Sequence, residues 1–204
     1  MKNLYILGDS GTKYLVDPFT DTDYFHDIRI DDTFLHIRAF PSTSAYKVNF
    51  EMLDSIVFEE GAIVLFYFGM VDIRSFATRY NNIDEVALNY TKTVEEYFKD
   101  KDITFGFIEP ALTPHIDDWL NVFPELSNWI SGSLEERIIE HKKFVNVISL
   151  QKLFIPLVGP ILDSYYLNSS LTDDFNHYNI ETNNLILDHI LSTVYAFVAS
   201  DTMD

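Results

Sequence analysis

The 204-residue chain contains no cysteine. This absence excludes disulfide bonds, thiolate nucleophiles and zinc sites with cysteine ligands, and it fits a reducing compartment. No apolar run approaches the ~20 residues of a membrane-spanning helix. The first residues, 1–3, lead directly into an apolar segment and show no signal-peptide pattern. We therefore expect a cytoplasmic protein without a membrane partner, or a component of a virion or phage particle assembled in the cytoplasm.

Basic residues are scarce, because 14 Lys and Arg stand against 32 Asp and Glu and leave a net charge of -18. Proteins that bind nucleic acids need clustered Lys and Arg to neutralise phosphates, so we expect no nucleic-acid partner. The acidic residues are dispersed, which is typical of a solvated surface. Hydrophobic residues make up 47% of the chain, as in folded globular proteins. The length fits a single domain over residues 1–204.

Apolar runs in the sequence predict strands that alternate with helices. Three runs, at 4–7, 62–68 and 103–108, are almost continuously apolar, which is typical of parallel strands buried on both faces. Two further strands are predicted at 34–40 and 144–148. Alternating strands and helices indicate an α/β fold with a parallel sheet and helices on both faces. We therefore predict a three-layer α/β/α domain with a mainly parallel, five-stranded sheet.

Capping patterns and helical spacing predict the helices between these strands. Asn82, followed by Glu85, has the spacing of a capping box at the start of an amphipathic helix. A second capping box, Ser-Leu-Glu-Glu, opens a predicted helix over 133–143. The last predicted helix, about 180–198, is mostly apolar, and 45–57 is a weaker candidate.

The most informative motif is Gly-Asp-Ser at 8–10, where the first predicted strand ends. A serine hydroxyl is a weak nucleophile at neutral pH and needs a neighbouring base. His177, near the end of the chain, is the candidate base for Ser10, and Asp174 or Asp173 would orient its ring. Each group also has a simpler interpretation, because Ser10 suits a turn or helix cap and the Asp-His pair suits a solvated turn.

Taken together and in this order, the motifs resemble the SGNH (GDSL-type) hydrolase family. Residues 8–10 resemble its first block, which carries the nucleophilic serine, and 174–177 resemble its last block. The sequence Phe-Gly-Met-Val-Asp-Ile-Arg at 68–74 resembles a divergent third block, and 42–45 stands where the second block is expected. The resemblance covers essentially the whole chain. It implies a flavodoxin-like SGNH hydrolase fold with Ser10, His177 and Asp174 as the catalytic residues.

Two departures from the family pattern concern the groups that stabilise the oxyanion. The second block lacks the usual glycine and offers Ser42 and Ser44, and Val71 stands where the third block usually has asparagine. Losing one such donor typically costs about 10²–10³ in rate. Arg74 is a candidate replacement, although it would equally suit an ion pair with Asp72 or Asp9. The residues expected to line the oxyanion and substrate site are Asp9, Ser42, Ser44, Gly69, Asp72 and Arg74.

The resemblance implies a serine esterase that acts on a small-molecule or glycan ester, with acetyl groups on a glycan as the leading substrate, and that needs no cofactor. Acyl transfer to a sugar hydroxyl would use the same residues. The alternative is a catalytically degenerate module that binds glycan or a protein partner. A cation site of clustered carboxylates is a weaker hypothesis, and we predict no metal. Aromatic residues that would form a platform for sugar rings are Trp119, Trp129, Tyr165 and Tyr166. The sequence does not indicate the oligomeric state.

Overall fold

A computed structural model describes residues 2–16, 23–41, 43–75, 80–110, 132–160 and 179–201. Within these ranges the chain forms one sheet with the strand order β2-β3-β1-β4-β5-β6, and all pairs are parallel except β2 with β3. The strands are β1 (Lys2–Gly8), β2 (Phe25–Ile30), β3 (Thr33–Ala39), β4 (Ala62–Tyr67), β5 (Ile103–Ile108) and β6 (Phe154–Ile155). The helices are η1 (Ser10–Leu15), η2 (Ala45–Lys47), α1 (Phe50–Asp54), α2 (Met70–Arg74), α4 (Ile83–Phe98), α6 (Leu134–Ile148) and α7 (Ile180–Asp201).

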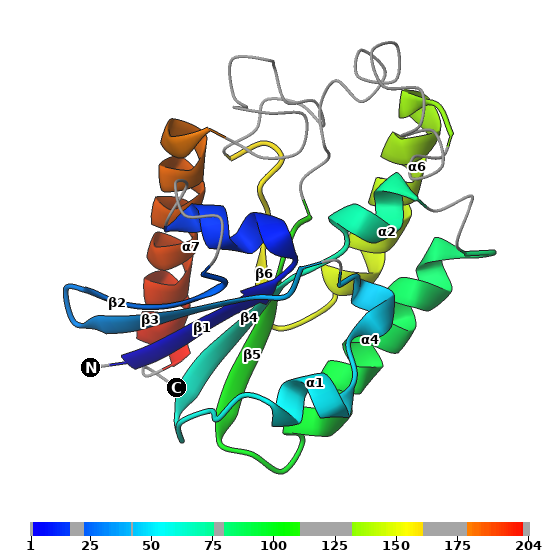
Figure 1. Ribbon diagram of the computed structural model, residues 1–204. Coiled ribbons are helices and arrows are strands. Elements are labelled where there is room, and N and C mark those ends of the chain that lie inside the picture. The colour runs from blue at the N-terminus through cyan, green and yellow to red at the C-terminus, as the bar shows by residue number, and fades with distance from the viewer. Residues whose placement is uncertain are drawn as a thin grey trace.

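Helices cover both faces of the sheet, so the predicted three-layer α/β/α architecture is confirmed (Figure 1). The helix α7 lies on one face together with η1, and α1, α4 and α6 lie on the other. The central strands explain this arrangement, because alternate residues of β4 point to opposite faces and both sets are buried. None of the helices in the described parts of the chain is long and apolar enough to cross a membrane.

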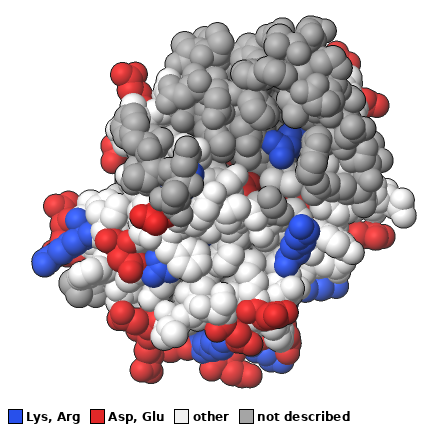
Figure 2. Space-filling view, viewed as in Figure 1, with Lys and Arg blue, Asp and Glu red and all other residues white. Residues whose placement is uncertain are grey.

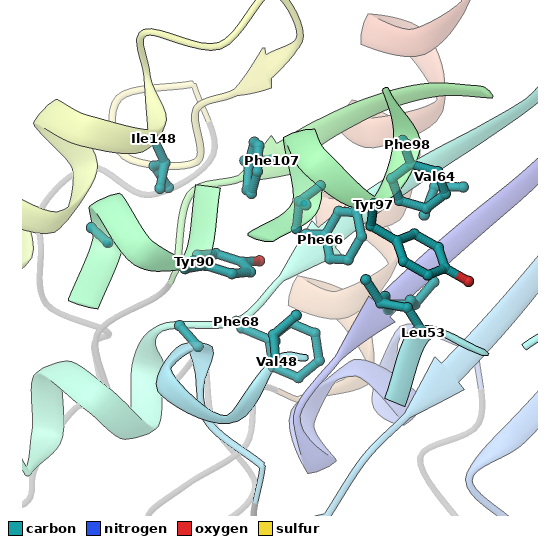
Figure 3. Close-up of a cluster of buried hydrophobic side chains, with 14 of the residues drawn as sticks. Val48, Leu53, Val64, Phe66, Phe68, Tyr90, Tyr97, Phe98, Phe107 and Ile148 are labelled. Carbon is teal, nitrogen blue, oxygen red and sulfur yellow. The ribbon is translucent and has the colours of Figure 1, made fainter. Parts of the chain in front are cut away.

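The two faces of the sheet have different cores. The α7 face is aliphatic, with Leu65 of β4 packed against Ile186 and Ile190 of α7. The α4 face is aromatic, and Figure 3 shows the side chains of β4 and β5 pointing toward α4. There the Tyr90 ring of α4 meets the Phe107 ring edge-on, with the ring centroids 5.1 Å apart. Edge-on aromatic pairs stabilise such a core beyond the area that they bury.

Four of the five predicted strands and the main predicted helices are confirmed. Asn82 caps α4 by accepting the N–H of Asp84, and the capping box of Ser133 and Glu136 is formed in full at the start of α6. The candidate helix at 45–57 is two short pieces, η2 and α1. They are separate helices because Asn49 has extended backbone and caps α1.

The predicted strand at 144–148 is wrong, because this segment is the end of α6. Phe144 and Ile148 are four residues apart and both are fully buried on one side of that helix. The sheet has six strands in place of the predicted five, since β2 and the two-residue β6 were not predicted. The strand β2 is an antiparallel edge strand whose alternate residues are exposed, so it lacks the apolar run of a buried strand.

Candidate active site

The candidate nucleophile Ser10 lies at the carboxyl end of β1, the strand between β3 and β4. Ser10 is the first residue of η1, and Asp9 is the cap of that helix, with its Oδ1 accepting the N–H of Gly11 at 2.9 Å. Asp9 is buried, whereas Ser10 is half-buried. Because Asp9 supplies the cap, the Ser10 hydroxyl does not carry out the capping role that its sequence position also suited.

Gly8 determines how tightly the chain turns into Ser10. A Cβ atom at this position would overlap the hydroxyl of Thr12 and lie 2.6 Å from the carbonyl oxygen of Tyr67. Thr12 is fully buried in η1, so it has no space to move away. The Phe40 N–H donates to the Gly8 carbonyl at 2.8 Å, which holds the end of β3 beside the turn. Only glycine lets η1 fold back this closely on the strand ends.

Gly69 is the residue just before α2, at the carboxyl end of β4, next to β1. Its φ of +125° is a conformation that side chains rarely adopt, and a Cβ atom would lie 2.7 Å from the Phe144 ring. Val71, at the position where the family usually has asparagine, is buried with 9% of its surface exposed. Its side chain has no hydrogen-bond donor, so α2 supplies no side-chain donor from this position.

Asp72 is fully buried and joins α2 to the segment after β3. Its Oδ2 accepts the N–H of Ala45 at 2.7 Å, and its Oδ1 accepts the N–H of Tyr46 at 3.3 Å and the hydroxyl of Tyr80 at 2.7 Å. Burial raises the pKa of Asp72, and these hydrogen bonds partly offset the rise. Both oxygens are engaged by the protein itself, so the geometry favours a positioning role over substrate contact.

The other predicted oxyanion groups lie around this connection. The Ser44 side chain is buried, and its Oγ lies 3.4 Å from the hydroxyl of Tyr80. Arg74 is half-buried at the end of α2. The donors to Asp72 among the described residues are the N–H groups of Ala45 and Tyr46 and the hydroxyl of Tyr80. A role for Ser44 or Arg74 at the oxyanion stays a prediction.

A further buried carboxylate follows β5. Glu109 Oε2 accepts the N–H groups of Leu157 at 2.7 Å and Val158 at 2.9 Å, and burial raises the pKa of this carboxyl. His141 of α6 lies beside it, with Nε2 donating to the Pro110 carbonyl at 2.8 Å and 3.5 Å from Glu109 Oε1. Burial lowers the pKa of His141 to about 4, so its imidazole is neutral near pH 7.

No local sequence pattern predicts these contacts, because their partners come from different strands and helices. Burial raises the pKa of Tyr67 at the end of β4, and the carboxylates Asp9 and Glu109 raise it further. Within the described residues, no three His, Asp or Glu side chains are grouped as a metal site would require. The predicted residues that lie outside the described residues are Ser42, Trp119, Trp129, Tyr165, Tyr166, Asp173, Asp174 and His177.

Comparisons with known proteins identify the fold. No family model matches the sequence, and no curated protein matches it. Among solved structures, a GDSL-like lipase from Bacteroides thetaiotaomicron is similar, with a TM-score of 0.65 and 16% identity over 96% of this chain and 88% of that one. A lipolytic G-D-S-L family member from Veillonella parvula has a TM-score of 0.61 and 12% identity over 94% of this chain and 97% of that one.

A catalytic mutant of an acetylxylan esterase from Geobacillus stearothermophilus has a TM-score of 0.61 and 9% identity over 95% of this chain and 94% of that one. At such low identities these likenesses describe the backbone, and they span nearly the whole of each molecule. The predicted resemblance is therefore confirmed, and this chain has the fold of the SGNH (GDSL-type) hydrolases with a divergent sequence.

Proposed function

We propose that this protein is a serine esterase of the SGNH type that removes acyl groups, chiefly acetyl groups, from a glycan. Ser10 is the nucleophile, His177 the general base and Asp174 the group that orients His177. The observation that supports this most is the position of Ser10, half-buried at the carboxyl end of a central strand between two loop-bearing strand ends. Open α/β sheets bind their ligands at this edge.

In the proposed reaction the Ser10 oxygen attacks the ester carbonyl carbon while His177 takes the hydroxyl proton. The tetrahedral intermediate collapses when the bond to the sugar oxygen breaks, and His177 returns the proton to that oxygen. Water then attacks the acyl-enzyme by the same route and releases the acid. The backbone N–H of Ser10 holds the oxyanion, with Ser42, Ser44, Gly69 or Arg74 as further contributors. If a second sugar hydroxyl replaces water, the same residues carry out acyl transfer.

A second candidate function is binding of a glycan or a protein partner without turnover. The observation that favours it is the loss of the usual donors, since Val71 is apolar and buried and the Ser44 side chain lies against Tyr80. An oxyanion site with one donor fewer is typically slower by about 10²–10³. The esterase remains the leading candidate because a complete Ser, His and Asp set has no role in a simple binding module.

The test is hydrolysis of p-nitrophenyl acetate by the wild-type protein, by Ser10→Ala and by Ser55→Ala. Ser55 is a matched control, because it is an exposed serine just after α1 and its hydroxyl bonds only locally, to the Met52 carbonyl. We expect Ser10→Ala to lose activity by about 10³-fold or more and Ser55→Ala to keep it. A serine-reactive phosphonate should label Ser10 in the wild type.

Two outcomes would contradict the esterase. Equal rates for the wild type and Ser10→Ala would remove Ser10 as the nucleophile. Absence of both hydrolysis and phosphonate labelling in the folded wild type would favour the binding module.

A further inference from the structure

Tyr46 is an exposed aromatic residue that follows β3, the strand paired with the one that ends at the candidate nucleophile. It belongs to η2, directly after β3, and 65% of its surface is exposed. Single exposed aromatic side chains are common and need no special explanation. Two properties of Tyr46 distinguish it from the other exposed aromatic residues in the described parts of the chain.

The first property is the way in which Tyr46 is held. Its ring lies against the ring of Tyr80, with the centroids 5.3 Å apart and the planes at 46°. The Tyr80 hydroxyl and the Tyr46 N–H both donate to Oδ1 of Asp72, at 2.7 and 3.3 Å. Burying a carboxylate is unfavourable unless it is hydrogen-bonded, so Asp72 holds its donors firmly. Both tyrosines are thus attached to one buried group while the Tyr46 ring faces solvent.

The second property is the position of this tyrosine pair. Tyr46 follows β3 and Asp72 lies after β4, and these two strands flank β1, which ends at Ser10. The Asp72 hydrogen bonds therefore connect the loops on either side of Ser10. Figure 2 shows that basic and acidic side chains are interspersed with uncharged ones on the face that carries α1 in Figure 1.

From this geometry we infer that Tyr46, supported by Tyr80, is a stacking platform for a pyranose ring of the substrate glycan. A pyranose ring has an apolar face of C–H groups, which packs on an aromatic ring, and hydroxyl groups around its rim, which remain solvated. Because the ring is held before binding, little conformational freedom is lost on stacking. The inference rests on the proposed function for the claim that the stacked sugar carries the ester; the stacking itself does not require catalysis.

The first experiment compares two substrates, acetylated xylohexaose and p-nitrophenyl acetate, with the variants Tyr46→Ala, Tyr46→Phe and Tyr195→Ala. Tyr195 is the matched control, an exposed tyrosine on α7 whose hydroxyl bonds to Thr33. We expect Tyr46→Ala to raise KM for the oligosaccharide about tenfold and to leave p-nitrophenyl acetate within about twofold, since one stacking contact is lost. Tyr46→Phe should keep most of the wild-type KM, and Tyr195→Ala should match the wild type on both substrates.

A second experiment separates this inference from the catalytic proposal. Binding of acetylated xylohexaose and of chitohexaose is measured by calorimetry in a Ser10→Ala background, with and without Tyr46→Ala. Binding that weakens about tenfold with Tyr46→Ala supports the platform even if the wild type hydrolyses no ester, in which case the esterase alone fails. Unchanged binding, an equal loss on both substrates in the first experiment, or no binding of either oligosaccharide would overturn the platform, whether or not Ser10 is the nucleophile.

Discussion

The two edges of the sheet use acidic side chains in opposite ways. At the carboxyl edge, Asp9, Asp72 and Glu109 are buried, and each accepts at least one backbone N–H; those bound by Asp72 and Glu109 come from other segments of the chain. At the amino edge, Asp54 and Asp102 are exposed. A pocket of about 350 Å³ lies at that edge between the segment after α1, the end of α4 and the start of β5. The same residue types connect loops at one edge and contact solvent at the other.

This difference indicates what the carboxyl edge is built for. A buried carboxylate contributes little net stability compared with an apolar side chain of similar size, but removing it leaves its donors without an acceptor. Asp72 and Glu109 therefore define the positions of backbone segments around Ser10 more than they strengthen the fold. The exposed acids at the amino edge contribute mainly to the charge of -18 and to solvation.

The largest effect should come from removing one buried acid and comparing it with an exposed one. Asp72→Ala leaves two backbone N–H groups and the Tyr80 hydroxyl without their acceptor, so we expect the free energy of unfolding to fall by about 3–5 kcal/mol. Asp54→Ala removes one exposed acceptor, of the Tyr97 hydroxyl, and should cost about 1 kcal/mol or less. Urea denaturation measures both. Equal losses for the two variants would show that the buried acid at the carboxyl edge is no more important for stability than the exposed acid at the amino edge.

The elements around Asp72 also show which parts of the structure can be predicted from the sequence and which cannot. The apolar run at 62–68 predicted β4 because burial on both faces leaves a local signal. The run at 144–148 is too short to distinguish a strand from a buried helix, and β2 alternates exposed residues such as Asp27 and Arg29 with half-buried ones.

No local pattern marks the partners of a buried carboxylate. Ala45 meets Asp72 because β3 and β4 lie on either side of β1, and Tyr80 reaches Asp72 from the residues just before α4. The sequence therefore indicated Asp72 as a residue of the site but not what it contacts. For the same reason the sequence predicted Ser10 at a strand end but did not predict the pair of Tyr46 and Tyr80.

The next effect concerns the pH dependence of stability at the carboxyl edge. The folded pKa of His141 is about 4, below its ordinary value of 6.5, so the unfolded chain binds a proton that the folded protein excludes. The contribution of His141 to the free energy of unfolding is therefore complete above pH 6.5. It is lost as the pH falls from 6.5 toward 4, and the loss amounts to about 3 kcal/mol in all. His141→Gln keeps a donor for the Pro110 carbonyl and does not titrate. We expect it to flatten the loss of stability between pH 6.5 and 4, measured by urea denaturation.

Glu109 provides a second test of this pH dependence, because its pKa shifts in the opposite direction from that of His141. Burial raises the folded pKa of Glu109, so the folded protein holds this proton more firmly than the unfolded chain does. That contribution grows as the pH falls, and it partly offsets the loss caused by His141. Glu109→Gln should therefore steepen the acid-side loss of stability. If both variants changed the slope in the same direction, at least one of the two shifts would have the wrong sign.

A smaller effect is expected from restoring a missing donor at the carboxyl edge. Val71→Asn introduces an amide at the position where the family usually carries its oxyanion asparagine. If Ser10 is the nucleophile, kcat for p-nitrophenyl acetate should rise about tenfold, a cautious fraction of the 10²–10³ that such a donor is typically worth. Val71→Thr, which keeps the shape but reaches less far, is the control. An unchanged kcat in a folded Val71→Asn protein would show that the oxyanion is already held by other groups.

The smallest effect should be found at the amino edge. Burial and the hydrogen bond to Asp54 raise the pKa of Tyr97 to about 12, and the Tyr97 hydroxyl donates to Asp54 Oδ1 at 2.9 Å. Tyr97→Phe removes this hydroxyl and keeps the ring that packs against Phe98, so unfolding should become easier by only about 1 kcal/mol. Because this contact lies at the edge opposite Ser10, ester hydrolysis should not change. A loss of kcat without unfolding would mean that the two edges of the sheet are coupled through α4. The amino edge would then affect catalysis at the carboxyl edge, and the two edges would not have separate roles.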